Sequence, residues 1–320
     1  MSRSRGMVAV TGATGFLGRH VVAALAAAGW QVRILARSQP VHPLWQDLEP
    51  EVVLGGLSDA DALRRLVSGA DAVLHLAGLI KARNAAEFMR VNCEGSRALA
   101  AAVAAYAPGA HFLLVSSLAA REPALSGYAA SKRAAEAAVF DALGRKRVSI
   151  VRPPAIYGPG DRETLVIFKL ARRKRIPILG RMDARVAMIH VEDAARVLAA
   201  QLAEPPSGLV HAIADHRPDG YTWQEIFQTA ALAVTNPQPR FIAVPPALTR
   251  AVGLCGGALA RLLSQPGMVN AGKVRELLHR DWRVSEPELL IVSDANPKIT
   301  LPAGFAATAA WYRRAGWLTV

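Results

Sequence analysis

Cysteine is nearly absent from this chain, with only Cys93 and Cys255 among its 320 residues. Two cysteines do not make a disulfide framework, and neither lies in a Cys-x-x-Cys or a Cys/His metal-binding spacing. We therefore expect reduced thiols, a cytoplasmic location in which thiols stay reduced, and no metal site.

The sequence also lacks a long apolar run. A membrane-spanning helix needs about 20 consecutive apolar residues, and we expect no such helix here. The N-terminal stretch MSRSRGMVAV is basic and then only briefly apolar, without a small-residue cleavage site. We interpret it as leading into the first strand rather than as a signal peptide. With 52% hydrophobic and 20% charged residues, the composition is that of a folded protein.

Acidic residues are outnumbered by basic ones. The 38 Lys and Arg residues face 25 Asp and Glu residues, which gives a formal charge of +13 and a pI near 10.5. Such a charge attracts phosphorylated cofactors, acidic substrates or membrane surfaces, and it equally suits an Arg-rich surface that serves only solubility. No recognised nucleic-acid motif occurs, so we expect no nucleic-acid partner.

The first half of the chain alternates between two hydrophobic periods. Short runs rich in Val, Leu and Ile occur at Met7–Thr11, Gln31–Leu35, Glu51–Leu54, Ala72–Leu76, His111–Ser116 and Val148–Val151. Helix-like stretches lie between several of them, at Phe16–Ala28, Asp59–Leu66, Glu87–Tyr106 and Tyr128–Leu143. Strands that alternate with helices predict an α/β fold with a doubly wound parallel sheet.

The pattern changes after about Pro153. RPPAIYGPGD is a Pro/Gly-dense loop, a basic helix is expected near Arg162–Arg175, and RVAMIHVEDAARVLAAQLA predicts a strand that leads into a helix and returns to the main sheet. We expect a nucleotide-binding domain at 1–155 plus about 185–214. A smaller substrate-binding lobe is expected at 156–184 and 215–320.

A glycine-rich turn, TGATGFLG, joins the first strand to the first helix. A tight turn needs a residue that tolerates positive φ, and a pyrophosphate must approach bare backbone at a helix N-terminus. A glycine turn without a ligand is the alternative. The residues expected to contact the ligand here are Gly12, Thr14, Gly15, Phe16, Leu17 and Gly18.

A Tyr-x-x-x-Lys pair, Tyr128 and Lys132, follows the strand at His111–Val115, which ends in Ser116 and Ser117. A phenol with an ordinary pKa near 10 is a poor base, and an ammonium one helical turn away favours the phenolate. Two polar residues on the outside of an Ala-rich helix are the alternative. The serines at the carboxyl edge of the sheet favour a site.

TGATGFLG and the Ser–Tyr–Lys order resemble the extended branch of the short-chain dehydrogenase/reductase superfamily, the NAD-dependent epimerase/dehydratase family. The resemblance implies that Ser117 is the catalytic hydroxyl, Tyr128 the acid/base and Lys132 the residue that tunes the pKa of Tyr128. It also implies that Tyr128 contacts the cofactor and that Lys132 binds the cofactor ribose. Asn92, in RVNCEG, resembles the supporting asparagine of the family, and a plain buried asparagine is the alternative.

Cofactor preference is read from the end of the second strand. Ala36 stands where relatives that prefer NAD carry an acid, and Arg37 follows at once, which suits a ribose 2′-phosphate. The resemblance also implies cofactor contacts at Leu57, Ala77 and Pro153. We expect NADP, with NAD as the alternative. If Arg37 instead stacks on the adenine ring, which both cofactors share, it does not distinguish NADP from NAD.

The substrate side is less specific. Ala155 stands where nucleotide-sugar enzymes of the family usually carry an asparagine, so the loop resembles hydroxysteroid dehydrogenases and dihydroflavonol reductases. We expect oxidation or reduction of a small or lipid-like molecule. The alternatives are a nucleotide-sugar epimerase or dehydratase and a non-catalytic assembly protein of a membrane complex. For Pro245–Gly267 three alternatives stay open: the segment packs on the core, lines an apolar pocket or contacts a membrane surface. The resemblance also implies a homodimer.

Overall fold

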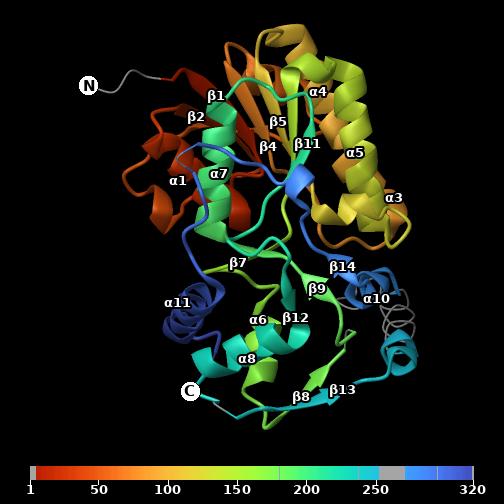
Figure 1. The fold of residues 1–320 in the computed structure, drawn as a ribbon. Helices are drawn as coiled ribbons and strands as arrows, with labels where there is room; N and C mark the ends of the chain where they lie inside the picture. Colours follow the sequence, from red (N-terminus) through yellow and green to blue (C-terminus); the bar gives the residue numbers. More distant parts are fainter. Residues whose placement is uncertain (1–4, 180, 237, 252–270, 294, 319–320) are drawn as a thin grey trace. The chain divides into compact units, whose positions relative to one another are not determined.

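The computed structural model describes residues 5–179, 181–236, 238–251, 271–293 and 295–318 (Figure 1). The chain divides into two compact units. Unit 1 comprises the chain up to Arg152 together with Ala195–His211 and Leu290–Asn296, and unit 2 comprises the rest. Cys255 and most of Pro245–Gly267 lie outside the described residues.

Unit 1 is built on a seven-stranded sheet in the order β11-β6-β5-β4-β1-β2-β3. Its strands are β1 (Met7–Thr11), β2 (Gln31–Ala36), β3 (Glu51–Leu54), β4 (Ala72–His75), β5 (His111–Val115), β6 (Val148–Arg152) and β11 (Val210–Ala212). The strands β1 to β6 pair in parallel, and the direction of winding reverses between β1 and β4. The structure therefore confirms the doubly wound Rossmann fold, whose ligands bind at the carboxyl edge beside this reversal.

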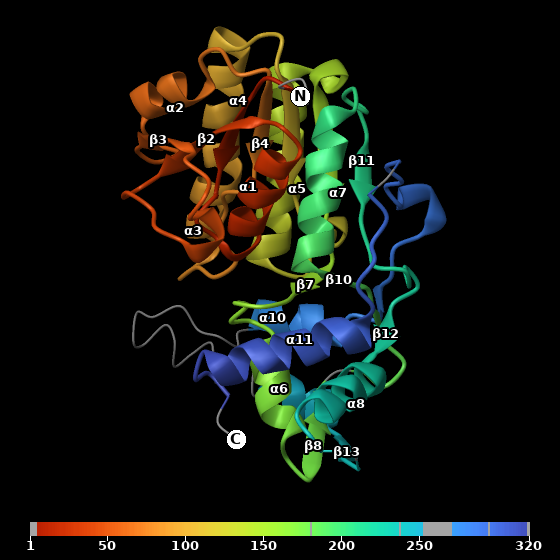
Figure 2. The ribbon, with the colours of Figure 1, turned by 90° about the vertical axis from the view of Figure 1, so that its left-hand side faces the viewer.

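Helices cover both faces of this sheet. They are α1 (Phe16–Ala27), α2 (Ala60–Val67), α3 (Ala85–Phe88), α4 (Gly95–Tyr106), α5 (Gly127–Leu143) and α7 (Val191–Ala203). Figures 1 and 2 show α1 and α7 on one face and α2, α4 and α5 on the other. The second face holds a continuous core in which Leu66, Leu99 and Val139 pack on Phe112 of β5. Burial of these apolar side chains stabilises the sheet that carries the site.

Two elements of the structure differ from the expectations. The helix expected at Glu87–Tyr106 contains a π-helical turn at Met89–Glu94, so α3 and α4 are separate. The prediction that the strand near residue 188 joins the main sheet was wrong. Met188–His190 (β10) pairs instead with β7 (Ala155–Tyr157), and β11 supplies the seventh strand.

Unit 2 combines short strands with helices around an aromatic core. Its further elements are α6 (Leu165–Ala171), β8 (Arg175–Ile178), β9 (Arg185–Val186), β12 (Tyr221–Thr222), α8 (Trp223–Ala233), β13 (Arg240–Ala243), α10 (Ala271–Leu278), β14 (Asp281–Trp282) and α11 (Leu301–Arg314). Phe305 of α11 packs edge-on against Tyr157, with ring centroids 4.9 Å apart, and also against Phe168. The basic helix expected at Arg162–Arg175 is shorter, because the chain turns at Arg172 into β8. No helix in the described ranges combines the length and apolar character that crossing a membrane requires.

Candidate active site

The glycine turn between β1 and α1 leaves no room for side chains. Gly12 has φ +75°, and a Cβ at this position would lie 2.6 Å from the backbone nitrogen of Ala77, which follows β4. A Cβ on Gly18 would lie 2.1 Å from the carbonyl oxygen of Gly12. The turn therefore brings α1 and the end of β4 against bare backbone, which is the geometry a diphosphate needs.

The N-terminus of α1 suits an anion. Its N-cap is Gly15, and within the described chain no side chain caps the helix and no acidic residue stands in its first turn. The first backbone N–H groups of a helix have no intrahelical acceptor, and they carry the positive end of the helix dipole. Phe16, Leu17 and Gly18 occupy these positions, and Thr14 is exposed beside them. The loop thus fits the pyrophosphate of a dinucleotide.

The remaining predicted cofactor residues lie along the strand ends. Arg37 is exposed directly after β2, and it makes no ion pair with any described residue. Leu57 follows β3 and packs against Gly95 at the start of α4. The backbone nitrogen of Ala77 donates to the hydroxyl of Thr11 at 3.4 Å. Pro153 is buried directly after β6 and begins the chain segment of unit 2.

Tyr128 lies in the first turn of α5. The side chain of Ser126 caps this helix by accepting the backbone N–H of Ala129 at 3.0 Å. The Tyr128 ring is partly buried and meets Phe88 of α3 edge-on, with ring centroids 5.9 Å apart. The cap fixes where α5 begins, and the aromatic contact holds the phenol ring against α3.

Lys132 lies one helical turn after Tyr128 and is 7% exposed. Its Nζ donates to the carbonyl oxygen of Val115, the last residue of β5, at 2.8 Å. A Cβ on Gly78 would lie 3.9 Å from Nζ, so the ammonium also sits beside the loop after β4. Burial lowers the pKa of Lys132 to about 8, and the nearby Glu136 carboxylate opposes this by raising it. Residues four apart share a helix face, so the ammonium and the phenol project from the same side of α5.

The two serines after β5 have different surroundings. Ser116 is 6% exposed and donates its hydroxyl to the Glu136 carboxylate. Ser117 is only partly buried, and its Oγ accepts the backbone N–H of Ala119 at 3.2 Å. A hydroxyl that accepts this bond keeps its proton to donate elsewhere. Ser117 is therefore the better placed of the two to bind a substrate oxygen.

Asn92 lies in the π-helical turn and is 1% exposed. Its side-chain oxygen accepts the N–H of Leu79 at 2.7 Å, and its Nδ2 donates to the carbonyl of Leu79 and to the hydroxyl of Ser131. These bonds tie the loop after β4 to α5. The amide is thus engaged within the protein, where it connects the loop after β4 to the helix that carries Tyr128 and Lys132.

A buried ion pair beneath Lys132 was not anticipated from the sequence. Arg152, at the end of β6, donates to both carboxylate oxygens of Glu136, at 2.8 and 2.6 Å. The two side chains are 10% and 5% exposed. The available signal was an acid one helical turn after Lys132, together with an arginine at the end of an otherwise apolar strand.

A second buried chain joins the glycine turn to Asn92. The Thr11 hydroxyl bonds to His75 Nδ1, His75 Nε2 lies 2.8 Å from Ser96 Oγ, and Ser96 donates to the carbonyl oxygen of Asn92. Because the serine proton goes to a carbonyl, His75 must donate from Nε2 and accept at Nδ1. Burial, and secondarily the charge of Lys132, lowers the pKa of His75 to about 3. The imidazole is therefore a neutral link in this chain.

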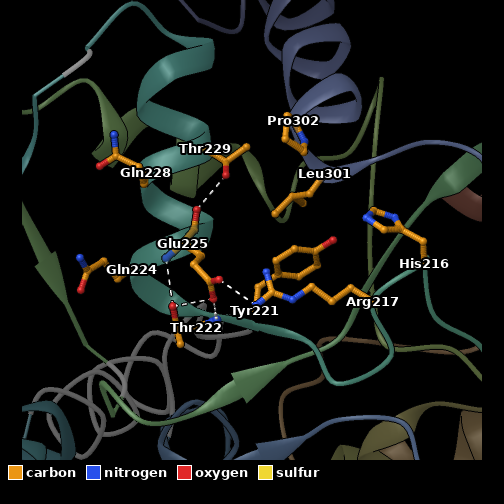
Figure 3. Close-up of a pocket in the computed structure, with 10 residues that line it drawn as sticks. All are labelled: His216, Arg217, Tyr221, Thr222, Gln224, Glu225, Gln228, Thr229, Leu301 and Pro302. Atoms are coloured by element: carbon orange, nitrogen blue, oxygen red, sulfur yellow. Dashed lines mark hydrogen bonds and ion pairs between the residues drawn. The ribbon is translucent and has the colours of Figure 1, made fainter. Parts of the chain in front are cut away.

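A cavity of about 660 Å³ in unit 2 contains none of the predicted site residues (Figure 3). Glu225 accepts from Thr222 and pairs with Arg217 at 2.8 Å, and Arg217 lies over the ring of Tyr221. Gln224 and Gln228 also line it, and in Figure 3 they project from α8 on the side away from Arg217 and Tyr221. The charged side chains Arg217 and Glu225 of this cavity are thus paired with each other. His190, also in unit 2, lies outside the cavity and is buried at the end of β10.

The parallel sheet, its bare glycine turn and the polar groups at its carboxyl edge define a dinucleotide-binding protein of the Rossmann type. A model of the NAD dependent epimerase/dehydratase family matches residues 8–213. The chain belongs to this family, which confirms the resemblance to extended short-chain dehydrogenases/reductases.

Individual curated proteins and a solved structure match most of the chain. The chain is 53% identical over 316 residues to the ceramide reductase of Caulobacter vibrioides (strain NA1000 / CB15N), covering 98% of this chain and 97% of that protein. It is 28% identical over 255 residues to the mitochondrial NADH dehydrogenase (ubiquinone) 1 alpha subcomplex subunit 9 of Arabidopsis thaliana, covering 77% and 62%. The crystal structure of gox2253 has the same fold, with a TM-score of 0.75 at 21% identity over 99% of this chain and 100% of that one.

Proposed function

We propose that the protein is an NADP-preferring reductase that converts the ketone of a ceramide-class lipid to an alcohol. One observation carries the chemistry: a buried ammonium, Lys132, lies one turn from Tyr128 at the same sheet edge as the glycine turn. The lipid class rests on the 53% identity to the ceramide reductase over nearly the full length of both chains.

The residues of this chain divide the work on the carbonyl group. When bound, the reduced nicotinamide supplies a hydride to the carbonyl carbon. Tyr128 donates its phenolic proton to the carbonyl oxygen, which completes the alcohol. Ser117 donates a hydrogen bond to the same oxygen and stabilises the negative charge that develops there. Lys132 favours the phenolate that Tyr128 leaves, because an opposite charge nearby stabilises the ionised form.

The preference for NADP is supported by the end of β2. Ala36 is buried and cannot bind a ribose hydroxyl, and the exposed guanidinium of Arg37 has no described carboxylate paired with it. A guanidinium binds a phosphate through charge-assisted hydrogen bonds, worth about 1.5–3 kcal/mol each. We expect Arg37→Ala to raise the KM for NADPH more than tenfold and to leave the KM for NADH almost unchanged. Equal changes for both cofactors would contradict this assignment.

The reaction is tested with purified protein, NADPH and the keto form of a ceramide in detergent micelles. Loss of absorbance at the reduced nicotinamide band should match formation of the alcohol, measured by mass spectrometry. We expect Tyr128→Phe to abolish turnover while NADPH still binds, as followed by its fluorescence. Turnover that persists in this variant would show that another group donates the proton.

The same assay separates the rival functions. A nucleotide-sugar epimerase would retain its cofactor tightly and convert a sugar nucleotide without net loss of NADPH. An assembly protein resembling the plant mitochondrial subunit would bind NADPH and turn over no carbonyl compound. Either result would overturn the proposal.

A further inference from the structure

The second unit carries a concentration of positive charge that the proposed reaction does not use. Arg173 and Lys174 lie between α6 and β8, Arg175 begins β8, and Arg240 begins β13. We call these four exposed residues the basic tip. Figures 1 and 2 show β8 and β13 side by side at one end of unit 2, beyond α6 and α8.

The backbone of the basic tip is fixed by hydrogen bonds. Asn236 Nδ2 donates to the carbonyl oxygens of Ala171 and Arg173, at 2.7 and 3.1 Å. The backbone N–H of Arg240 donates to the carbonyl of Lys174 at 3.0 Å. The four charges are therefore presented from an ordered turn and strand pair.

The pairing of the two strands places like charges opposite one another. Arg175 and Arg240 are partners in the parallel register of β8 and β13. Like charges directly opposite each other in a sheet are destabilising. No described carboxylate forms an ion pair with any of the four side chains of the basic tip. An external anion would relieve this repulsion, so the arrangement suits a negatively charged partner.

Apolar side chains continue the same surface. Ile176 and Ile178 of β8 are fully buried, so the alternate positions, including Arg175, face outward. Ile242, two residues after Arg240, is 46% exposed, and Leu179 after β8 is 39% exposed. The Thr249 hydroxyl donates to the carbonyl of Leu179, which brings the 56% exposed Leu248 near the residue that follows β8. We call Leu179, Ile242 and Leu248 the apolar rim.

We infer that the basic tip and the apolar rim form a docking surface for a bilayer containing anionic phospholipid. Four cations with no internal carboxylate complement acidic headgroups, and the adjacent apolar side chains can enter the headgroup boundary. A nucleic acid would use the charge but leave the apolar rim unexplained. The inference does not rest on the proposed reaction, because binding to vesicles requires neither cofactor nor turnover.

The test is sedimentation of the full chain with vesicles of phosphatidylcholine containing about one-fifth phosphatidylglycerol. Each basic side chain near an anionic surface strengthens binding about fivefold. We expect replacement of all four basic-tip residues by Gln to weaken binding at least a hundredfold. Pure phosphatidylcholine should bind neither protein. The matched control removes four exposed charges from unit 1, by replacing Arg64, Arg65, Arg97 and Lys146 with Gln, and should retain binding within about fivefold.

Further arms identify the occupant. Ile242→Asn with Leu248→Asn should weaken vesicle binding at high salt, where charge attraction is screened. Millimolar inorganic phosphate should not displace the vesicles, because a free anion does not reproduce the apolar contact. Equal loss of binding in the control variant would overturn the inference, as would tighter binding of a DNA duplex through the same four residues. Thermal unfolding of each variant establishes that it is folded, and ketone turnover in micelles separates this result from the proposed reaction.

Discussion

Replacing Lys132 by methionine should stabilise the folded protein and abolish turnover. The ammonium is buried, and burial lowers its pKa from the ordinary 10.5 to about 8. Each unit of pKa corresponds to 1.36 kcal/mol, so this difference is about 3 kcal/mol of destabilisation at pH 7. Methionine fills a similar volume with no charge to desolvate.

Two contacts of Lys132 decide how much of this gain remains. The hydrogen bond from Nζ to Val115 is lost, which costs about 1 kcal/mol. The Glu136 carboxylate keeps its bonds to Arg152 and Ser116, so no buried charge is left unpaired. We therefore expect the free energy of unfolding of Lys132→Met to exceed that of the wild type by about 2 kcal/mol at pH 7.

The pH dependence identifies the cause. The folded-state pKa of about 8 lies below the unfolded value of 10.5, so the unfolded chain binds more protons between these values. The stability that deprotonation of Lys132 contributes is present above about pH 10.5 and is lost as pH falls through 8. The advantage of the methionine variant should therefore shrink from pH 8 toward pH 10.

Urea denaturation of both proteins at pH 7 and pH 10 measures how the stability difference between the variant and the wild type changes with pH. The titration of all other groups cancels in this comparison. Lys146→Met, at an exposed lysine of the same unit, is the matched control and should show no such pH dependence. A Lys132→Met protein that is less stable than the wild type by the same amount at both pH values would refute the argument from burial.

Three further substitutions test the surroundings of the site. Gly18→Ala places a methyl 2.1 Å from the Gly12 carbonyl oxygen, so we expect about 1–3 kcal/mol of destabilisation. The affinity for NADPH, measured by fluorescence titration, should also fall. Glu136→Gln removes the charge that raises the pKa of Lys132, so the alkaline limb of the kcat–pH profile should move to lower pH, with reduced stability in denaturation. Asn92→Ala leaves the Leu79 N–H without its acceptor, so the melting temperature and kcat should fall while the KM for NADPH changes little.

Much of unit 1 could be predicted because its signals are local. Each buried parallel strand is a short run of branched apolar residues, and the turn at Gly12 requires a residue without a side chain. The strand at Met188–His190 was misplaced for the opposite reason. A short apolar strand carries no information on its partner, and its pairing with Ala155–Tyr157 depends on contacts distant in sequence.

The candidate site was predictable as a set of residue types and less so as a network. Helical spacing places Tyr128 and Lys132 on one face of α5, and the strand end places Ser117 at the sheet edge. The π-helical turn that aims Asn92 at Leu79 has no simple sequence signature, since it depends on packing between helices. The pairing of Glu136 with Arg152 required knowing that β6 lies next to β5.

The Glu136–Arg152 pair explains how the Lys132 ammonium can be buried here without being held by the carboxylate. If Arg152 were absent, Glu136 would be free to pair directly with Lys132, which would raise the pKa of the ammonium and turn it toward the carboxylate. Instead Arg152 binds both carboxylate oxygens and Ser116 binds one of them. The ammonium therefore bonds to the carbonyl of Val115, at the end of β5, and two of its three donors remain. The ionised Glu136 carboxylate, paired with Arg152, thus still favours the charged form of Lys132. The Lys132 hydrogen bond stays directed at the sheet edge.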